Sequence, residues 1–297
     1  MSPKAPGKPD VSIATRSVPL VPPGRQPRKR PTFPVSTPFL RRISGRDNPE
    51  FKRFLAVKAR KNRDLILVDG PKMLGEAIRS GMLVEAVALD EASMNAHRAL
   101  VEGPPLVIFT PPLIKALSDV ETPQGILALV RRPRFDETWV LDQNAFVLVL
   151  DGLQDPGNVG TLFRTAEATG VTGILMTMGC ADPFSPKALR SSAGSVFRVP
   201  HIAGLSIDDV LRLLPKSVAL LTTSVAPSSP SLFDAELRLP LALALGSEGS
   251  GLDRRIEGAA TQRVRIPQAR PVESLNVAAA GAVALFEIAR RAGILQS

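Results

Sequence analysis

The stretch AFVLVLDGLQDPGNVGTLFRTAEATG, residues 145–170, decides the fold of this chain. Its apolar run at 145–150 predicts a buried strand, and the pattern over 159–169 predicts a helix that ends at Gly170. Asn158 stands where the residue that caps this helix would be expected. A buried strand followed by a glycine-rich turn and a helix is typical of α/β proteins, whose ligands collect at the carboxyl ends of strands.

The same alternation of strands and helices continues on both sides of this stretch. Further strands are expected at 65–68, 84–89, 105–109, 125–130, 173–176, 195–200, 218–224, 241–246 and 263–267. Further helices are expected after an Asn48 cap with Pro49 at the first position, at 70–81, near 92–101, around 111–118, within 185–194, at 206–214 and at 274–292. This organisation predicts two α/β domains, a small one over 39–131 and a second over 143–297, joined by a linker at 132–142.

The positive charge of the chain is concentrated in its N-terminal segment. The net charge is +9, and residues 1–46 hold three Lys and seven Arg against Asp10 alone, so the remainder sums to zero. Residues 1–38 contain 10 of the 28 prolines, which predicts a disordered Pro/Arg-rich arm. A solvated tail, an arm that attracts phosphates and a targeting peptide are the three uses left open for it.

Several classes of protein are disfavoured by composition. His97 and His201 stand far apart with no cluster of Cys or carboxylates, so neither a metal site nor a His-dependent triad is expected. We expect His97 at the surface and His201 in a loop. The single cysteine, Cys180, excludes an intramolecular disulfide and fits a reducing compartment. No uncharged apolar stretch is long enough to span a membrane, and we expect a cytoplasmic protein.

Three strand ends carry unusual polar turns: DGLQDPGNVG at 151–160, GSEGSGL at 246–252 and IPQARPVESLN at 266–276. None of them fits the usual phosphate loops, because the chain has no G-x-x-x-x-G-K-[ST] and GSEGSG is not G-x-G-x-x-G. The nucleophile elbow G-x-S-x-G is also absent. Three such turns in one half point to a ligand site other than a conventional nucleotide loop.

In order, these turns closely resemble the three signature motifs of the SpoU (TrmH-like) RNA ribose 2′-O-methyltransferases of the SPOUT superfamily. SPKALRSSAGSVFRVP at 185–200 is similar to the family segment between the first two motifs. RKNRDLILVDGPKMLGEAI and DVETPQGILALV resemble the family's RNA substrate-binding domain, with Asp69 where a glutamate is expected. The resemblance covers residues 48–293.

This resemblance implies an α/β fold of two parts. The C-terminal parallel-sheet domain would contain a deep trefoil knot, and the small N-terminal domain would be L30e-like. The family also implies a homodimer that forms through the knotted domain. One side of the last helix, with small residues and Phe286, would pack either in the core or in that dimer; its members are Ala278, Ala279, Ala282, Leu285, Phe286 and Ala289.

The activity implied by the resemblance is methyl transfer from S-adenosylmethionine to a ribose 2′-hydroxyl of RNA. Ribosomal RNA is favoured over tRNA because the separate N-terminal domain resembles that of enzymes that modify rRNA. A non-catalytic RNA-binding or ribosome-assembly factor on the same fold is the alternative.

The family's catalytic arginine corresponds to Arg164, held by Asn158 and close to Ser274 and Asn276. Arg164 could take the 2′-hydroxyl proton, or it could grip a phosphate and stabilise the developing alkoxide, which needs no loss of its own proton. Glu248 is the acid of the second motif and could order its loop or bind Arg164 or substrate. Ser274 could equally be the N-cap of the last helix.

The remaining site residues also follow from the resemblance. The cofactor would lie against Gly246, Ile266 and Leu275, with Thr222 and Thr223 as weaker candidates. The RNA candidates are Arg190, Ser191 and Ser192 near the active face, and Lys58, Arg60, Lys61 and Arg63 on the small domain. No metal ligand is expected.

Overall fold

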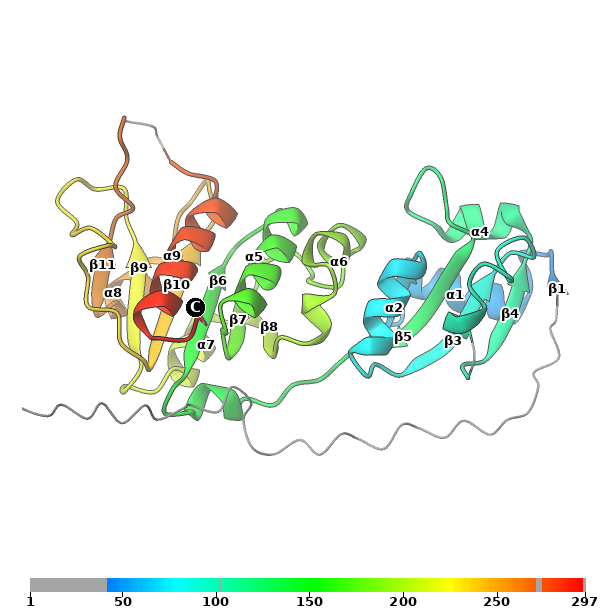
Figure 1. The fold of residues 1–297 in the computed structure, drawn as a ribbon, viewed down its shortest axis with the longest axis horizontal. Helices are drawn as coiled ribbons and strands as arrows, with labels where there is room; N and C mark the ends of the chain where they lie inside the picture. The colour runs from blue at the N-terminus through cyan, green and yellow to red at the C-terminus, as the bar shows by residue number, and fades with distance from the viewer. Residues whose placement is uncertain (1–41, 102, 271–273, 296–297) are drawn as a thin grey trace, which may run out of the picture. The chain divides into compact units, whose positions relative to one another are not determined.

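The structure, a computed structural model, describes residues 42–101, 103–270 and 274–295 (Figure 1). The predicted N-terminal arm therefore lies outside the described residues. Among the residues described, no helix is both long and apolar enough to cross a bilayer. The same part of the chain contains no group of three His, Cys, Asp or Glu residues that could hold a metal ion.

The N-terminal half folds around a five-stranded sheet with strand order β1-β4-β3-β5-β2. Strands β1, β4 and β3 are parallel, and β5 runs antiparallel to both β3 and β2. The strands are β1 Arg42–Ile43, β2 Leu65–Asp69, β3 Val84–Leu89, β4 Leu106–Phe109 and β5 Ile126–Arg131. The helices are α1 Pro49–Lys58, α2 Pro71–Arg79, α3 Arg98–Val101 and α4 Pro111–Leu117.

Helix α1 begins as its sequence predicts. Asn48 is the N-cap, its Oδ1 accepts a hydrogen bond from the Glu50 backbone N–H at 2.9 Å, and Pro49 takes the first helical position. Phe54 of this helix packs edge-on against Phe109 of β4, with ring centroids 5.4 Å apart. Helix α1 thereby covers one face of the small sheet.

The C-terminal half is a six-stranded parallel sheet with strand order β11-β9-β10-β6-β7-β8. The strands are β6 Phe146–Asp151, β7 Gly173–Thr177, β8 His201–Leu205, β9 Ala219–Thr223, β10 Leu241–Gly246 and β11 Gln262–Val264. The α-helices are α5 Pro156–Ala168, α6 Pro186–Ser192, α7 Ile207–Leu213, α8 Arg254–Ala259 and α9 Val277–Arg291. The 3-10 helices are η1 Thr138–Leu141 and η2 Ser195–Phe197.

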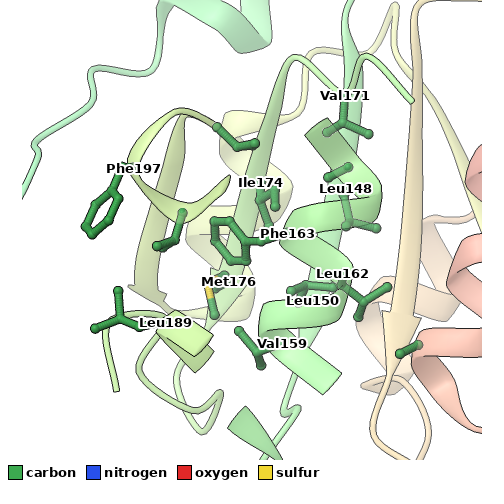
Figure 2. Packing of buried hydrophobic residues seen from close by; sticks show 14 of the residues in the cluster. Leu148, Leu150, Val159, Leu162, Phe163, Val171, Ile174, Met176, Leu189 and Phe197 are labelled. Carbon is green, nitrogen blue, oxygen red and sulfur yellow. The ribbon is translucent and has the colours of Figure 1, made fainter. Parts of the chain in front are cut away.

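Strand β6 explains why the C-terminal half has three layers, a sheet with helices on both of its faces. All six residues of β6 are buried, so the strand is covered on both faces, as is usual for parallel sheets. Leu148 and Leu150 share a core cluster with α5 and α9, whereas Val147 and Val149 share one with α7 and α8. Figure 1 shows α5 between α6 and α9. Figure 2 shows Leu162 and Phe163 of α5 among the buried side chains of β6 and β7.

The predicted strand at 195–200 is wrong. Residues Ser195–Phe197 form the 3-10 helix η2, which follows Ala193 and Gly194 in the left-handed region, and the strand β8 begins only at His201. The apolar side chains in this segment are buried, but by packing against α5 rather than by lying in a sheet. An apolar run of this length is compatible with either a buried strand or a short buried helix, so the sequence alone cannot distinguish them.

His201 is consequently a strand residue and not the expected loop residue. It is 8% exposed, its Nδ1 lies 3.0 Å from the Val199 carbonyl oxygen, and Phe135, Phe163 and Phe184 surround its ring. Burial lowers the pKa of His201 from 6.5 to about 4. The imidazole is therefore a neutral part of the core at physiological pH.

Other elements differ from the prediction in extent. Near 92–101 only Arg98–Val101 is helical, while β1 and α8 were not predicted. Within the predicted linker, η1 is ordered: Val140 is buried in the cluster of Val147 and Val149, and the Trp139 ring covers Gly173.

Candidate active site

The candidate site begins at the N-terminus of α5, where Asp155 and not Asn158 is the cap. Asp155 Oδ1 accepts hydrogen bonds from the Gly157 backbone N–H at 2.6 Å and from Lys187 Nζ at 2.7 Å. The Lys187 bond, followed by the Gly157 bond, holds the pKa of Asp155 below its usual range. Because Pro156 can occupy the first helical position, the helix starts earlier than predicted. The Asn158 side chain is thereby free for contacts outside the helix.

Asn158, Glu248 and Asn276 form one hydrogen-bonded cluster, with one residue from each of the three motifs. Asn158 Nδ2 donates to Glu248 Oε1 at 3.2 Å, and Asn276 Nδ2 donates to the same oxygen at 2.7 Å. Asn276 Nδ2 also donates to Asn158 Oδ1 at 3.2 Å. The three polar turns singled out in the sequence therefore meet at a single point.

Asn276 is the N-cap of α9, so the alternative that Ser274 caps this helix is wrong. Its Oδ1 accepts hydrogen bonds from the backbone N–H groups of Ala278 at 3.0 Å and Ala279 at 3.2 Å. The Val277 N–H lies 3.4 Å from Glu248 Oε1. The Glu248 carboxylate thus sits at the positive end of a 15-residue helix, which stabilises its charge. Ser274 is exposed and makes no hydrogen bond within the described residues.

Arg164 lies on the exposed side of α5. The expected contact with Asn158 is not made, since the side chain of Asn158 is bonded to Glu248 and Asn276. Within residues 42–101, 103–270 and 274–295, the Arg164 guanidinium has neither a hydrogen bond nor an ion pair. All of its donors are therefore available to an anionic ligand such as a phosphate.

The second motif is a tight hairpin at the end of β10. Backbone hydrogen bonds join Ser247 and Gly251 in both directions, at 3.1 and 3.0 Å. A Cβ on Gly246 would lie 2.2 Å from the Gly251 carbonyl carbon. Glycine is therefore required at position 246 because the backbone of the chain's own hairpin lies too close for a side chain.

Asp151, which the sequence analysis did not single out, ties this hairpin to the first motif. Its Oδ2 accepts the Asp253 backbone N–H at 2.7 Å, and its Oδ1 accepts the Thr177 hydroxyl at 2.8 Å. Asp151 is only 8% exposed although it ends an apolar strand. An acid at the end of a buried strand was the signal that could have identified it.

The cofactor candidates lie along the carboxyl edge of the same sheet. Leu275 is 36% exposed, Ile266 and Thr223 are half-buried, and Thr222 is 2% exposed within β9. Among the described residues of the third motif, 266–270 and 274–275 have no backbone hydrogen bonds. Free backbone donors and acceptors beside two apolar side chains are the groups that an adenine ring and its polar edge require.

The three RNA candidates on α6 differ in how far their side chains are exposed. Arg190 is exposed, and Ser191 Oγ donates to the Lys187 carbonyl at 3.0 Å. Ser192 has no exposed surface, and its hydroxyl donates to the Leu189 carbonyl at 3.0 Å. The assignment of Ser192 to RNA contact is therefore wrong for this fold, because the α5–α6 packing buries it.

In the N-terminal half of the chain, the side chain of Lys58 is bonded to the protein itself. Its Nζ donates to the carbonyls of Ala116 at 3.1 Å and Ser118 at 3.0 Å, and it lies 3.2 Å from Asp119. Arg60, Lys61 and Arg63 are exposed and have no acidic partner among the described residues. Of the four candidates in this half of the chain, these three, and not Lys58, are free to contact phosphates.

Comparisons with known proteins match both halves of the chain. The model of the SpoU rRNA Methylase family matches residues 145–286, and that of the MRM3-like substrate binding domain matches residues 50–128. The chain is 32% identical over 259 residues to an uncharacterized tRNA/rRNA methyltransferase of Synechocystis, which covers 84% of this chain and 93% of that protein. It is 30% identical over 240 residues to the 23S rRNA (guanosine(2553)-2′-O)-methyltransferase RlmP of Bacillus subtilis, covering 80% and 94%.

Solved structures give the same result. The AdoMet-bound rRNA methyltransferase from Sinorhizobium meliloti superposes with a TM-score of 0.74 at 26% identity, covering 86% of this chain and 99% of that one. The SpoU methyltransferase AviRb from Streptomyces viridochromogenes, in complex with AdoMet, gives 0.71 at 25% identity, covering 82% and 98%.

Proposed function

Because this chain belongs to the SpoU rRNA methylase family, we propose that it methylates a ribose 2′-hydroxyl of ribosomal RNA, with S-adenosylmethionine as the methyl donor. The observation that carries the proposal is the cluster of Asn158, Glu248 and Asn276. It joins the three motifs at the carboxyl edge of a parallel sheet, where ligands of α/β proteins bind.

Ribosomal RNA is favoured over tRNA by the relatives that match nearly end to end. RlmP of Bacillus subtilis is named for 23S rRNA, and a 23S rRNA (uridine(2479)-2′-O)-methyltransferase of Streptomyces viridochromogenes is 29% identical over 86% of this chain. We place the enzyme in the cytoplasm because these relatives named for 23S rRNA come from bacteria, whose ribosomes lie in the cytoplasm. The domain boundaries 39–131, 132–142 and 143–297 belong to the same proposal, with an L30e-like fold for the first.

S-adenosylmethionine supplies an activated methyl group when bound. The hairpin that starts at Gly246 and the backbone of 266–270 would hold it, with Ile266 and Leu275 against its adenine. Thr222 and Thr223 lie at the adjoining strand end. The free backbone groups and the half-exposed apolar side chains of the third motif fit such a ligand.

Arg164 is the residue to which we assign the contact with the substrate phosphate. A guanidinium keeps its proton in proteins, so it acts by positioning the RNA and by stabilising the negative charge that develops on the 2′-oxygen. Asn158 would orient the ribose, and Asn276, the N-cap of α9, donates a hydrogen bond to Asn158. Ser274 precedes this cap by two residues, and we assign it to substrate contact. Arg190 and Ser191 of α6, together with Arg60, Lys61 and Arg63, would contact flanking RNA.

We include the trefoil knot in the proposal, supported by the path of the chain after β11. The Arg265 backbone N–H donates to the Pro230 carbonyl at 2.9 Å, and the Leu232 N–H donates to the Arg265 carbonyl at 2.8 Å. The chain is thus held against the loop at 229–232 and next contacts Glu248 at the start of α9. A trefoil knot would require the last segment to thread through one of these loops, and these contacts support that proposal.

Mapping of ribose methylation in total RNA, with and without this protein, tests the proposed function. We expect one 2′-O-methyl position in ribosomal RNA to disappear when the gene is deleted and to return with the wild-type protein. The purified enzyme should methylate that position in unmodified rRNA with S-adenosylmethionine. Loss of a tRNA position instead would assign the alternative substrate, and no change in any RNA would contradict the enzymatic proposal.

A further inference from the structure

The Glu248 carboxylate uses one oxygen for the protein and leaves the other free. Oε1 accepts from Asn158 Nδ2, Asn276 Nδ2 and the Val277 N–H, at 3.2, 2.7 and 3.4 Å. Oε2 has no hydrogen-bond donor within the described residues, and the side chain is exposed. The carboxylate is therefore fixed in position while one of its oxygens can accept a proton from a ligand.

The orientation of both amides follows from the same network. Asn276 Oδ1 faces two backbone N–H groups, so its Nδ2 must donate, and both of its hydrogens are used by Asn158 Oδ1 and Glu248 Oε1. Asn158 Oδ1 is thus an acceptor, and its Nδ2 gives one hydrogen to Glu248. The second hydrogen of Asn158 Nδ2 has no acceptor in the part of the chain described. One N–H donor and one carboxylate oxygen of the same hydrogen-bonded cluster therefore have no partner among the described residues.

A hydroxyl group is the ligand that matches this pair, because it accepts one hydrogen bond at its oxygen and donates another from its proton. We propose that Glu248 Oε2 accepts the proton of the ribose 2′-hydroxyl while Asn158 Nδ2 donates to its oxygen. This assigns Glu248 as the general base of the reaction, and it rests on the proposed function. Arg164 then acts on the phosphate and on the developing charge.

The step balances in atoms and charge. The 2′-oxygen forms its bond to the methyl carbon as the carbon–sulfur bond breaks, and the electron pair of that bond stays on sulfur. The 2′-proton passes to Glu248 Oε2, so the positive charge of the donor and the negative charge of the carboxylate are both lost. Because Glu248 is exposed, the proton then passes to water.

The surroundings of Glu248 suit a base better than those of Arg164. A carboxylate can accept a proton at neutral pH, whereas a guanidinium carries none of the lone pairs needed. The Glu248 carboxylate is already in place before the reaction, at the start of α9. Backbone and amide donors restrict it to one orientation, which is the condition for proton transfer at a fixed site.

Glu248→Gln separates a base from a residue that only positions its neighbours. The amide retains an oxygen that can accept from Asn158 and Asn276, but it cannot take up a proton. We expect kcat for the mapped rRNA position to fall by about 100-fold or more, with KM for both substrates within a few-fold. Glu236→Gln, at an exposed glutamate outside the site, is the matched control and should keep wild-type rates.

Two further measurements do not depend on the rate of this variant. Formate added to Glu248→Ala should restore part of the activity, because a free carboxylate can occupy the vacated place. Wild-type enzyme should bind an RNA with a 2′-hydroxyl at the target nucleotide about tenfold more tightly than its 2′-deoxy analogue, and Glu248→Ala should lose this preference.

The outcomes are distinguishable from failure of the proposed function. If the wild-type enzyme methylates rRNA and Glu248→Gln retains kcat within threefold, Glu248 is not the base. Absence of formate rescue together with an unchanged ribose preference in Glu248→Ala would also overturn the assignment. If the wild-type enzyme itself methylates no RNA, the proposed function fails first.

Discussion

Single residues in this protein owe their roles to what they do or do not contact. Arg164 and Glu248 are both exposed, yet Glu248 is fixed through three donors and Arg164 has no partner among the described residues. A fixed carboxylate suits chemistry on a bound group, and an unpaired guanidinium suits capture of an anion. The two charges thus suit different parts of the proposed reaction, anion binding by Arg164 and proton transfer by Glu248.

Arg164→Ala should reduce kcat by at least about 100-fold, because the group that neutralises charge in the transition state is lost. Arg164→Lys should recover little, since an ammonium cannot reproduce the planar, bidentate fork. Calorimetry should show S-adenosylmethionine binding unchanged in both variants. Arg238→Ala, at an exposed arginine outside the site, is the control. Wild-type turnover in Arg164→Ala would remove this residue from the mechanism.

His201 should make the fold sensitive to mild acid. Its folded pKa of about 4 lies below its unfolded value of 6.5, so between these values the unfolded chain binds the extra proton. Its stabilisation is complete above pH 6.5 and declines as the pH falls to about 4, by on the order of 3 kcal/mol. Urea unfolding at several pH values measures this.

His201→Leu is the variant that isolates the histidine, because leucine fills a similar volume and has no proton to bind. The dependence of unfolding free energy on pH between 4 and 6.5 should be shallower in this variant. Equal slopes in the two proteins would contradict the buried, neutral state of His201.

At the scale of elements, the crossing of α5 and α6 requires a residue without a side chain. A Cβ on Gly160 would lie 2.0 Å from Ser191 Oγ and 2.4 Å from the Ala188 carbonyl oxygen. The second of these is backbone, so α6 as a whole would have to move. Ser191 therefore packs against α5 in addition to its proposed role toward RNA, whereas Ser192 is buried and serves packing alone.

Gly160→Ala should destabilise the protein by about 1–3 kcal/mol despite the higher helix propensity of alanine. Gly258→Ala in α8 is the matched control, since nothing lies within 4 Å of its Cβ position. That substitution should be stabilising by about 0.5–1 kcal/mol. Chemical denaturation of both variants measures the difference, and the same sign of change in both would contradict the packing argument.

At the scale of the whole molecule, α9 presents two apolar faces. Ala278, Leu285 and Ala289 of the predicted face are buried, and Gly281 contacts Leu162 and Leu245. Ala279 and Phe286 of that predicted face are instead exposed, with Phe286 at 46% and the neighbouring Val283 at 38%. From this exposed apolar face of α9 we propose that two copies of the chain form a homodimer through this helix, as the sequence resemblance implied.

Phe286→Glu should convert the dimer to a monomer without unfolding it, because a charge on the exposed face costs nothing until two copies meet. Sedimentation or light scattering gives the mass, and circular dichroism reports the fold. Lys216→Gln, at an exposed lysine outside α9, is the control because it changes the net charge by the same one unit. A monomeric wild-type protein, or a dimeric variant, would contradict this interface.

The sequence by itself determined most of the helices and strands and indicated which turns would carry a site. Apolar runs such as 145–150 predict strands because burial on both faces needs continuous hydrophobicity, and β6 through α5 follow within a few residues of expectation. The three polar turns were also recognisable, as local glycine-rich patterns at strand ends.

Only the tertiary structure decided which polar atoms meet. Asn158 lies 90 residues from Glu248 and 118 from Asn276, and no local pattern encodes which of these side chains bond. The same is true of the cap at Asp155, the burial of Ser192 and the neutral His201, each of which depends on an element packed from elsewhere. Local propensity selects helices and strands, whereas the site arises from contacts between segments that are distant in the chain.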